Sequence, residues 1–199
     1  MSASRLLCGI DEAGRGPLAG PVCAAAVILP KDFPAGILND SKKLSPAVRE
    51  KLKKLICSSS AAWGIGWASA AEIDEINILR ASLLAMKRAF EAMIDGMTEG
   101  ITGGDAAASG IIRAVVDGLF VPEIPVPCEA LVKADSKVPE VMAASILAKT
   151  ARDHLMEYYA LFYPQYGYEK HKGYPTKAHR EAIQRYGPSP IQRMSFQVK

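Results

Sequence analysis

Two adjacent carboxylates, Asp11 and Glu12, follow a short apolar segment near the N-terminus and precede a turn rich in glycine. Asp117 and Asp135 also follow short apolar runs further along the chain. If these runs are neighbouring strands of one sheet, the four carboxylates converge at one edge, where their charges repel strongly. Such a cluster either retains protons or binds divalent cations, and an all-oxygen ligand set favours Mg²⁺ or Mn²⁺ over zinc.

Taken one at a time, the aspartates have a plainer interpretation. Asp117 precedes Gly118, and an aspartate at the end of a strand is usually a turn former. Asp135 has the same alternative, while Asp153 lies four residues after Lys149 on an expected helix and is predicted to be its ion-pair partner. The three histidines of the chain form no metal-binding pattern. The carboxylates are therefore the candidate ligands.

The elements that position these acids are predicted from apolar periodicity and turn-forming residues. Strands are expected at residues 6–10, 22–29, 62–68, 111–116 and 130–133, and helices at residues 46–56, 71–93, 139–159 and 177–186. The first two strands are expected to form a hairpin, and Ser45 followed by Pro46 is typical of a helix start. Residues 96–104 are expected to form a flexible loop. This order of elements predicts one mixed α/β sheet with helices on its faces.

The composition describes an ordinary globular chain of one domain. It has 199 residues, of which 49% are hydrophobic and 23% are charged, enough to bury one sizeable core. The longest apolar stretch, residues 21–30, is far shorter than the roughly 20 residues that cross a bilayer, so a cytoplasmic protein without membrane contact is expected. The four cysteines are scattered without a C-x-x-C pair, which supports neither a zinc knuckle nor a disulfide framework.

The charge balance is a weak argument for a polyanionic partner, because the formal net charge is only +3. If four carboxylates are neutralised at a metal site, the 24 basic and 17 remaining acidic residues leave a net charge of +7. A net charge of +7 is a better match than +3 to the negatively charged phosphate backbone of a nucleic acid. A basic run that begins with Lys42 and Lys43 is either a solvated face or a phosphate contact.

A series of motifs along the chain resembles bacterial ribonuclease HII, of the type 2 ribonuclease H family. The motifs occur in the family's order: GIDEAGRGPLAGPV, DSKKL, EIDEINIL, VDG, KADSK, AASILAKTARD and HKGYPTKAH. The resemblance covers nearly the whole chain, and the spaced series is far more specific than an Asp-Glu pair alone. Leu119 stands where many members have Asn, and Ala134 where many have Gly, but neither departure removes a candidate ligand.

The resemblance implies a ribonuclease H-like mixed five-stranded sheet flanked by helices, with residues 161–199 as a helical C-terminal extension of a single domain. It also implies an endonuclease that hydrolyses the RNA strand of RNA/DNA hybrids. Such an enzyme incises 5′ to single ribonucleotides embedded in duplex DNA and leaves 3′-hydroxyl and 5′-phosphate ends. The expected role is ribonucleotide removal from DNA by a monomer without an obligate protein partner.

The same resemblance makes Asp11, Glu12, Asp117 and Asp135 the catalytic and metal-binding residues. They are expected to hold two Mg²⁺ or Mn²⁺ ions about 3.5 to 4 Å apart at the scissile phosphate. Asp11 is the expected bridging ligand, and the division of the other three between the ions stays open. A non-catalytic hybrid-binding protein with the same fold is the alternative, and the presence of all four acids argues against it.

Substrate reading is assigned by resemblance to Gly14-Arg15-Gly16, for the ribose 2′-OH, and to Tyr174, for the deoxyribose that follows. Glycines allow a sugar hydroxyl to approach the backbone. Lys42 and Lys43 are the expected phosphate contacts. The plainer interpretation is a tight hairpin turn for the glycines and a packed aromatic with a polar tip for Tyr174. Another nuclease of the same fold would share the acids but not this glycine and tyrosine pair.

Overall fold

The computed structural model describes residues 6–97 and 112–197. Its five strands form one mixed sheet, as predicted, and their order in the sheet is β3-β2-β1-β4-β5. The strands are β1 (Leu6–Ala13), β2 (Val22–Ile28), β3 (Ala62–Ala68), β4 (Ile112–Asp117) and β5 (Cys128–Leu131). Strand β2 pairs antiparallel with β1 and β3, whereas β4 pairs parallel with β1 and β5. The predicted hairpin is therefore β1-β2, and the parallel half of the sheet begins between β1 and β4.

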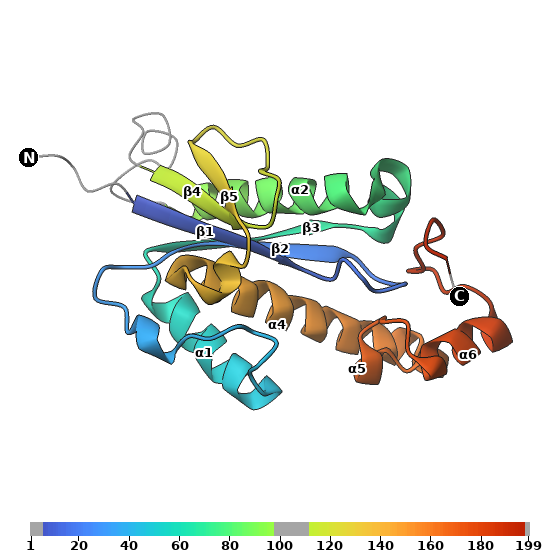
Figure 1. Ribbon diagram of the computed structural model, residues 1–199. Coiled ribbons are helices and arrows are strands. Elements are labelled where there is room, and N and C mark those ends of the chain that lie inside the picture. The colour runs from blue at the N-terminus through green and yellow to red at the C-terminus, as the bar shows by residue number, and fades with distance from the viewer. Residues whose placement is uncertain (1–5, 98–111, 198–199) are drawn as a thin grey trace, which may run out of the picture.

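Helices cover both faces of this sheet (Figure 1). They are α1 (Pro46–Ser59), α2 (Ala70–Gly96), α4 (Pro139–Phe162), α5 (Tyr168–His171) and α6 (Lys177–Tyr186). Helix α2 lies on one face, α1 and α4 lie on the other, and α5 and α6 follow the far end of α4 (Figure 1). None of the helices in the described part of the chain is long and apolar enough to span a membrane.

Strand β2 is buried along its whole length because side chains that alternate across it enter two different cores. On one face, Ala26 and its even-numbered neighbours pack with Phe90 of α2. On the other face, Val27 and its odd-numbered neighbours pack with Ile56 of α1 and Ala144 of α4. The sheet is thus the middle of three layers, and burial of both of its faces fixes the strand register.

The start of α1 follows the predicted capping chemistry, and α2 begins with a capping box that was not predicted. Ser45 accepts a hydrogen bond from the Val48 N–H with Pro46 at the first helical position, and a Ser69–Glu72 capping box begins α2. Helix α2 differs from the prediction at one point, because Asn77 has a φ of 68° and interrupts the helical backbone. Its side-chain oxygen accepts from the next turn of backbone N–H groups, so it caps the second part of the helix.

Two predicted strand boundaries were wrong. Strand β1 does not end before Asp11 but continues to Ala13, because its antiparallel pairing with β2 continues to the end of the strand. Strand β5 ends at Leu131, after which Lys133 adopts a left-handed backbone and a 3-10 turn, Ala134–Ser136, follows. The expected loop at residues 96–104 lies almost entirely outside the described residues.

Candidate active site

Three of the four predicted acids come together at the C-terminal ends of the parallel strands. Asp11, Asp117 and Asp135 each place a carboxylate oxygen within 4.8 Å of the others. Parallel pairing ends at Ile10 and Val116, so the next residues, Asp11 and Asp117, are neighbours on the face that α4 covers. Strand alternation and register therefore account for the first two members of the cluster.

Asp135 reaches the cluster through the turn that follows β5. A carboxylate oxygen of Asp117 accepts a hydrogen bond of 2.8 Å from the Ala134 N–H, which fixes that turn against the end of β4. Asp135 follows directly and is 7% exposed. Its position depends on a hydrogen bond to another member of the cluster, so the predicted direct strand-to-aspartate connection is replaced by an anchored turn.

Glu12 lies at the edge of this group. Consecutive residues of a strand point to opposite faces, so the adjacent position that made Glu12 a candidate also directs it away from Asp11. Its carboxylate pairs with Arg15 at 3.4 Å and is not one of the three acids within 4.8 Å. Burial raises the pKa of Glu12, Arg15 opposes that rise, and the charge of Asp117 adds to it. The negative charge of the cluster thus affects the pKa of Glu12, but Glu12 is not one of the three acids whose carboxylate oxygens lie together.

The cluster carries more negative charge than its surroundings neutralise. Burial, followed by the charges of Glu12 and Asp117, raises the pKa of Asp11 well above its usual range, and the Glu12 N–H and the Ser145 hydroxyl oppose this rise. Lys42 donates to Asp135 at 3.3 Å. Burial lowers the pKa of Lys42, but Asp135 and the neighbouring acids outweigh it and raise that pKa. An all-oxygen set with excess negative charge fits a hard divalent cation.

A cavity of about 520 Å³ opens beside the cluster and collects most of the predicted substrate residues. Its lining residues are Asp11, Glu12, Ala13, Gly14, Arg15, Gly16, Ser41, Lys42, Arg49, Ser145, Lys149 and Tyr174. Lys43 is exposed and is not among the described residues that line this cavity. Ser145 and Lys149 were not predicted, because they look like ordinary positions of a buried helix.

Tyr174 faces the Gly14-Arg15-Gly16 turn across this cavity. A Cβ atom placed on Gly16 would lie 3.8 Å from the Tyr174 ring, so the glycine leaves room in front of the aromatic face. The ring is flanked by cations, with the Lys149 Nζ atom 5.8 Å from its centroid. Tyr174 is 39% exposed, which leaves part of its surface for a ligand.

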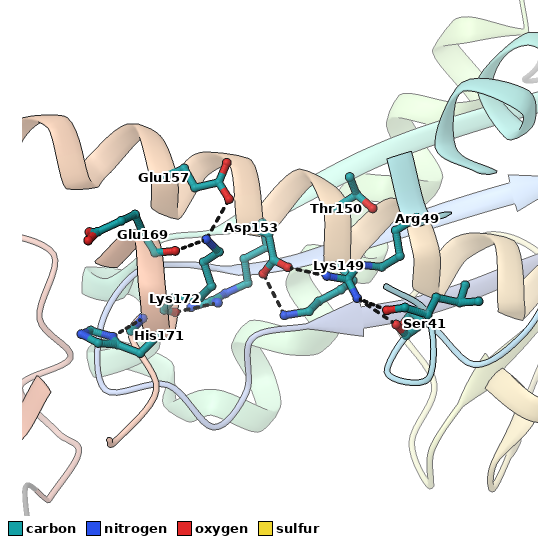
Figure 2. A network of polar contacts seen from close by, with 12 residues as sticks. Ser41, Arg49, Lys149, Thr150, Asp153, Glu157, Glu169, His171 and Lys172 are labelled. Atoms are coloured by element: carbon teal, nitrogen blue, oxygen red, sulfur yellow. Dashed lines mark hydrogen bonds and ion pairs between the residues drawn. The ribbon is translucent and has the colours of Figure 1, made fainter. Parts of the chain in front are cut away.

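A network of polar contacts joins the cavity to the groove between α1 and α4 (Figure 2). Asp153 pairs with Lys149 at 2.8 Å, as predicted, and also with Arg49 at 3.3 Å. Arg49 donates to the carbonyl oxygens of Ser41 and Leu44, which fixes the loop that carries Lys42. Ser41 and Ser145 hydrogen-bond to each other at 2.7 Å. No local sequence pattern reveals the Arg49–Asp153 and Ser41–Ser145 contacts, since each of them joins residues about 100 positions apart.

The mixed sheet and the acidic cluster at its strand ends define a metal-dependent endonuclease of the ribonuclease H fold. A solved structure described as ribonuclease H2 from Pyrococcus horikoshii OT3 superimposes with a TM-score of 0.71 and 26% identity, covering 97% of this chain and 94% of that chain.

The particular family follows from the sequence comparisons. The family model described as Ribonuclease HII matches residues 8–199. A ribonuclease HII of Treponema denticola is 58% identical over 198 residues, covering 98% of this chain and 99% of the relative. One from Pelodictyon phaeoclathratiforme is 49% identical over 98% of this chain and 90% of the relative. The chain therefore belongs to the ribonuclease HII family, and its activity is that of a ribonuclease H-type endonuclease on RNA/DNA substrates.

Proposed function

We propose that Asp11, Asp117 and Asp135 bind the divalent ions with which this enzyme cleaves its substrate. The convergence of these carboxylates within 4.8 Å is the observation that supports the proposal most directly. Two Mg²⁺ or Mn²⁺ ions bound there would activate water and stabilise the leaving 3′ oxygen. Asp11 is assigned the bridging position because it is the most deeply buried of the three and adjoins Asp117 across the strand pair.

Glu12 is proposed as the fourth ligand, after a change of partner. Its carboxylate is paired with Arg15, whose side chain is about half exposed at the cavity. When Glu12 turns to a metal, Arg15 is released toward the substrate phosphate. Lys42 is proposed to change partner in the same way. It pairs with Asp135, and it would become available to a substrate phosphate when a cation neutralises that carboxylate instead.

The proposed cleavage position follows from the sugars that the two sides of the cavity are assigned to contact. The Gly14-Arg15-Gly16 turn holds the 2′-OH of a ribonucleotide, and Tyr174 packs against the deoxyribose that follows. Metal ions held by Asp11, Asp117 and Asp135 would then engage the phosphate on the 5′ side of that ribose, and its hydrolysis would leave 3′-hydroxyl and 5′-phosphate ends. Lys42 and Lys43 contact backbone phosphates near this position.

The biological setting is proposed in the same terms. Ribonucleotides embedded in genomic DNA are the substrate, and the bacterial relatives support a cytoplasmic role in their removal. The acidic cluster and the described part of the cavity are formed by residues of one chain, which supports action as a monomer.

One gel assay tests these assignments. A labelled duplex with one embedded ribonucleotide is incubated with the protein and Mg²⁺ or Mn²⁺, beside an all-DNA duplex of the same sequence and a sample with excess EDTA. Cleavage on the 5′ side of the ribonucleotide alone, abolished by EDTA and restored by metal, is expected. Cleavage that persists in EDTA would contradict the metal mechanism, and cleavage at other positions would contradict the reading assignment.

A further inference from the structure

The backbone from Gly14 to Pro21 is held from behind by two arginines that come from distant parts of the chain. Arg152 belongs to α4, and Arg193 lies in the segment after α6. They are 1% and 0% exposed. Every hydrogen bond that their guanidinium groups donate within the described residues goes to a backbone carbonyl and none to a carboxylate. Two buried cations are thus used to hold main chain.

Arg193 binds the part of this backbone that faces the substrate cavity. Its Nη2 atom donates to the Gly14 carbonyl at 2.6 Å, and its Nη1 atom donates to the Arg15 carbonyl at 3.0 Å. Its Nε atom donates to the Gly20 carbonyl at 2.8 Å, so one guanidinium holds both ends of the turn. Burial, reinforced by the neighbouring charge of Arg152, lowers the pKa of Arg193.

Arg152 joins the same backbone to the tyrosine on the other side of the cavity. It donates to the carbonyls of Ala19 and Pro21 and, at 3.0 Å, to the carbonyl of Lys172. Its guanidinium carbon also lies 5.9 Å from the centroid of the Tyr174 ring. One side chain therefore holds the end of the backbone segment that begins with the proposed reading turn, and it also lies beside Tyr174.

The carbonyl directions determine where the amide groups of the turn point. A planar trans peptide directs its C=O and its N–H to opposite sides, and the described peptide bonds are all trans. Because the carbonyls of Gly14 and Arg15 point at Arg193, the following N–H groups, those of Arg15 and Gly16, point away from it. Residues 14–16 line the cavity beside Asp11, so this is where donors for a sugar oxygen are needed.

Gly14 itself is required by this arrangement. Its φ is +98°, a conformation that L side chains rarely adopt, and a Cβ atom there would lie 2.0 Å from the Arg152 Nε atom. A guanidinium that is buried without a carboxylate is costly unless its donors are all satisfied. Any movement of the turn would leave donors unpaired, so the two arginines oppose such movement.

We infer that Arg152 and Arg193 are positioning residues for substrate reading, which fix the Arg15 and Gly16 N–H groups in the direction of the ribose 2′-OH. This inference rests on the proposed reading role of the turn. It also makes the C-terminal segment part of the specificity apparatus. That segment is anchored by Asp74, whose carboxylate accepts from the N–H groups of Met194 at 2.8 Å and Ser195 at 2.9 Å.

The test compares Arg193→Lys with the wild type on two ligands. The rate of cleavage of a duplex with a single ribonucleotide gives kcat/KM, and inhibition by an unlabelled all-DNA duplex gives Ki. A lysine carries its donors on a single nitrogen and cannot reproduce the fork by which Nε, Nη1 and Nη2 reach three separate carbonyls, so kcat/KM is expected to fall by about tenfold or more. The Ki is expected to change by less than about twofold, because phosphate contacts that carry no 2′-OH information remain.

Two further variants keep the result interpretable. Asp74→Asn leaves both arginines in place but loosens the segment that carries Arg193, and the same selective loss, smaller in size, is expected. It also decides the question if Arg193→Lys does not fold, as judged by circular dichroism. Glu181→Ala removes an exposed carboxylate of α6 and is the matched control, for which neither constant should change.

The possible outcomes separate this inference from the function on which it rests. A folded Arg193→Lys with unchanged kcat/KM, or with equal losses in kcat/KM and in affinity for all-DNA duplex, would overturn the positioning role. A wild type that binds and cleaves without regard to the ribonucleotide would instead overturn the proposed reading, whatever the variants do. A selective loss in both Arg193→Lys and Asp74→Asn would support the inference.

Discussion

Single residues in the acidic cluster bear an electrostatic cost that either a retained proton or a bound cation relieves. Asp11 is 5% exposed, and its pKa is raised because burial and two neighbouring acids disfavour its charged form. Since its folded-state pKa lies above the unfolded value, the stability of the fold falls as pH rises from the unfolded pKa through the folded one, and the loss is constant at higher pH. A bound cation reverses this sign, so the same charge that costs stability provides affinity for metal.

Asp11→Asn should therefore separate stability from activity. Cleavage is expected to fall by orders of magnitude, because a ligand of the cluster is lost. In EDTA at neutral pH, the melting temperature should be equal to or above that of the wild type, since the variant lacks a buried charge. Added Mg²⁺ should raise the melting temperature of the wild type more than that of the variant, because it binds the variant less tightly.

The matched control for this variant is Asp95→Asn, at an exposed position near the end of α2. It should change neither cleavage nor the effect of Mg²⁺ on melting. An Asp11→Asn protein that is unfolded, or that cleaves at the wild-type rate, would contradict the role of Asp11 as a ligand.

Tyr174→Ala addresses reading by a single aromatic ring. Loss of a stacking contact worth on the order of 1 to 3 kcal/mol should lower kcat/KM roughly tenfold to a hundredfold for a duplex with one ribonucleotide. Cleavage within a long RNA/DNA hybrid should fall less, because no deoxyribose follows the cleavage site there. Tyr186→Ala, at another exposed tyrosine, is the control. Equal losses on both substrates would mean that Tyr174 supports the site without reading a junction.

At the scale of elements, the sequence predicts what local patterns determine. The apolar runs of β1, β2 and β4, the Ser45 cap and the acids after the strands were all visible in the sequence. The end of β5 was not, because the turn after it depends on a contact with Asp117, which lies 17 residues earlier in the chain, as well as on its own hydrogen bonds. The break at Asn77 was also missed, since apolar periodicity continues through it.

Residues that act at long range were the hardest to predict. Arg193 was predicted only as part of the C-terminal extension and not as a site residue, although its side chain is fully buried against the backbone of residues 14–20. A charged residue gives no local sign that it will hold carbonyls far away in the sequence. Arg152 offered a weak signal, because it lies four residues before Met156 on the buried side of α4.

The start of α2 provides a prediction with a defined pH dependence. Glu72 pairs with Arg88 at 2.8 Å and completes the capping box with Ser69. Its hydrogen bond to Arg88, followed by that to the Ser69 N–H, lowers the pKa of Glu72 from 4.5 to about 2. A depressed carboxylate pKa stabilises the fold above the unfolded value, and this stabilisation is lost as pH falls through the folded value.

Glu72→Gln should lower the free energy of unfolding by about 0.5 to 1 kcal/mol at neutral pH, because the pair is partly exposed and screened by solvent. Denaturant titrations of both proteins should show this difference above about pH 4.5 and its decline toward pH 2. Glu181→Gln, which alters a looser pair of 3.8 Å on α6, should show a smaller difference. A Glu72→Gln difference that persists unchanged at pH 2 would exclude the charge as its cause.

At the scale of the whole molecule, α4 connects the sheet to the C-terminal region. Its first half packs under β1 and β2, and its second half carries Arg152 and Met156, which contact the C-terminal segments. The close approach of α4 to β1 at Gly9, where a Cβ atom would lie 2.1 Å from the helix backbone, fixes this relationship. We propose that residues 161–199 are an extension of one domain rather than a separate unit.

This proposal predicts a single unfolding transition, and the chain supplies separate probes for its two ends. Both tryptophans, Trp63 and Trp67, belong to β3, whereas all seven tyrosines lie between Tyr158 and Tyr186. Thermal unfolding followed by tryptophan emission and by the near-ultraviolet circular dichroism of the tyrosines should give coincident midpoints, because two-state unfolding makes all probes agree. The buried hydrogen bonds of Arg152 and Arg193 cross the boundary and are lost if either part unfolds, which couples the two. Arg193→Lys should lower both midpoints together. Loss of the tyrosine signal at a lower temperature than the tryptophan signal would show that the C-terminal region unfolds by itself.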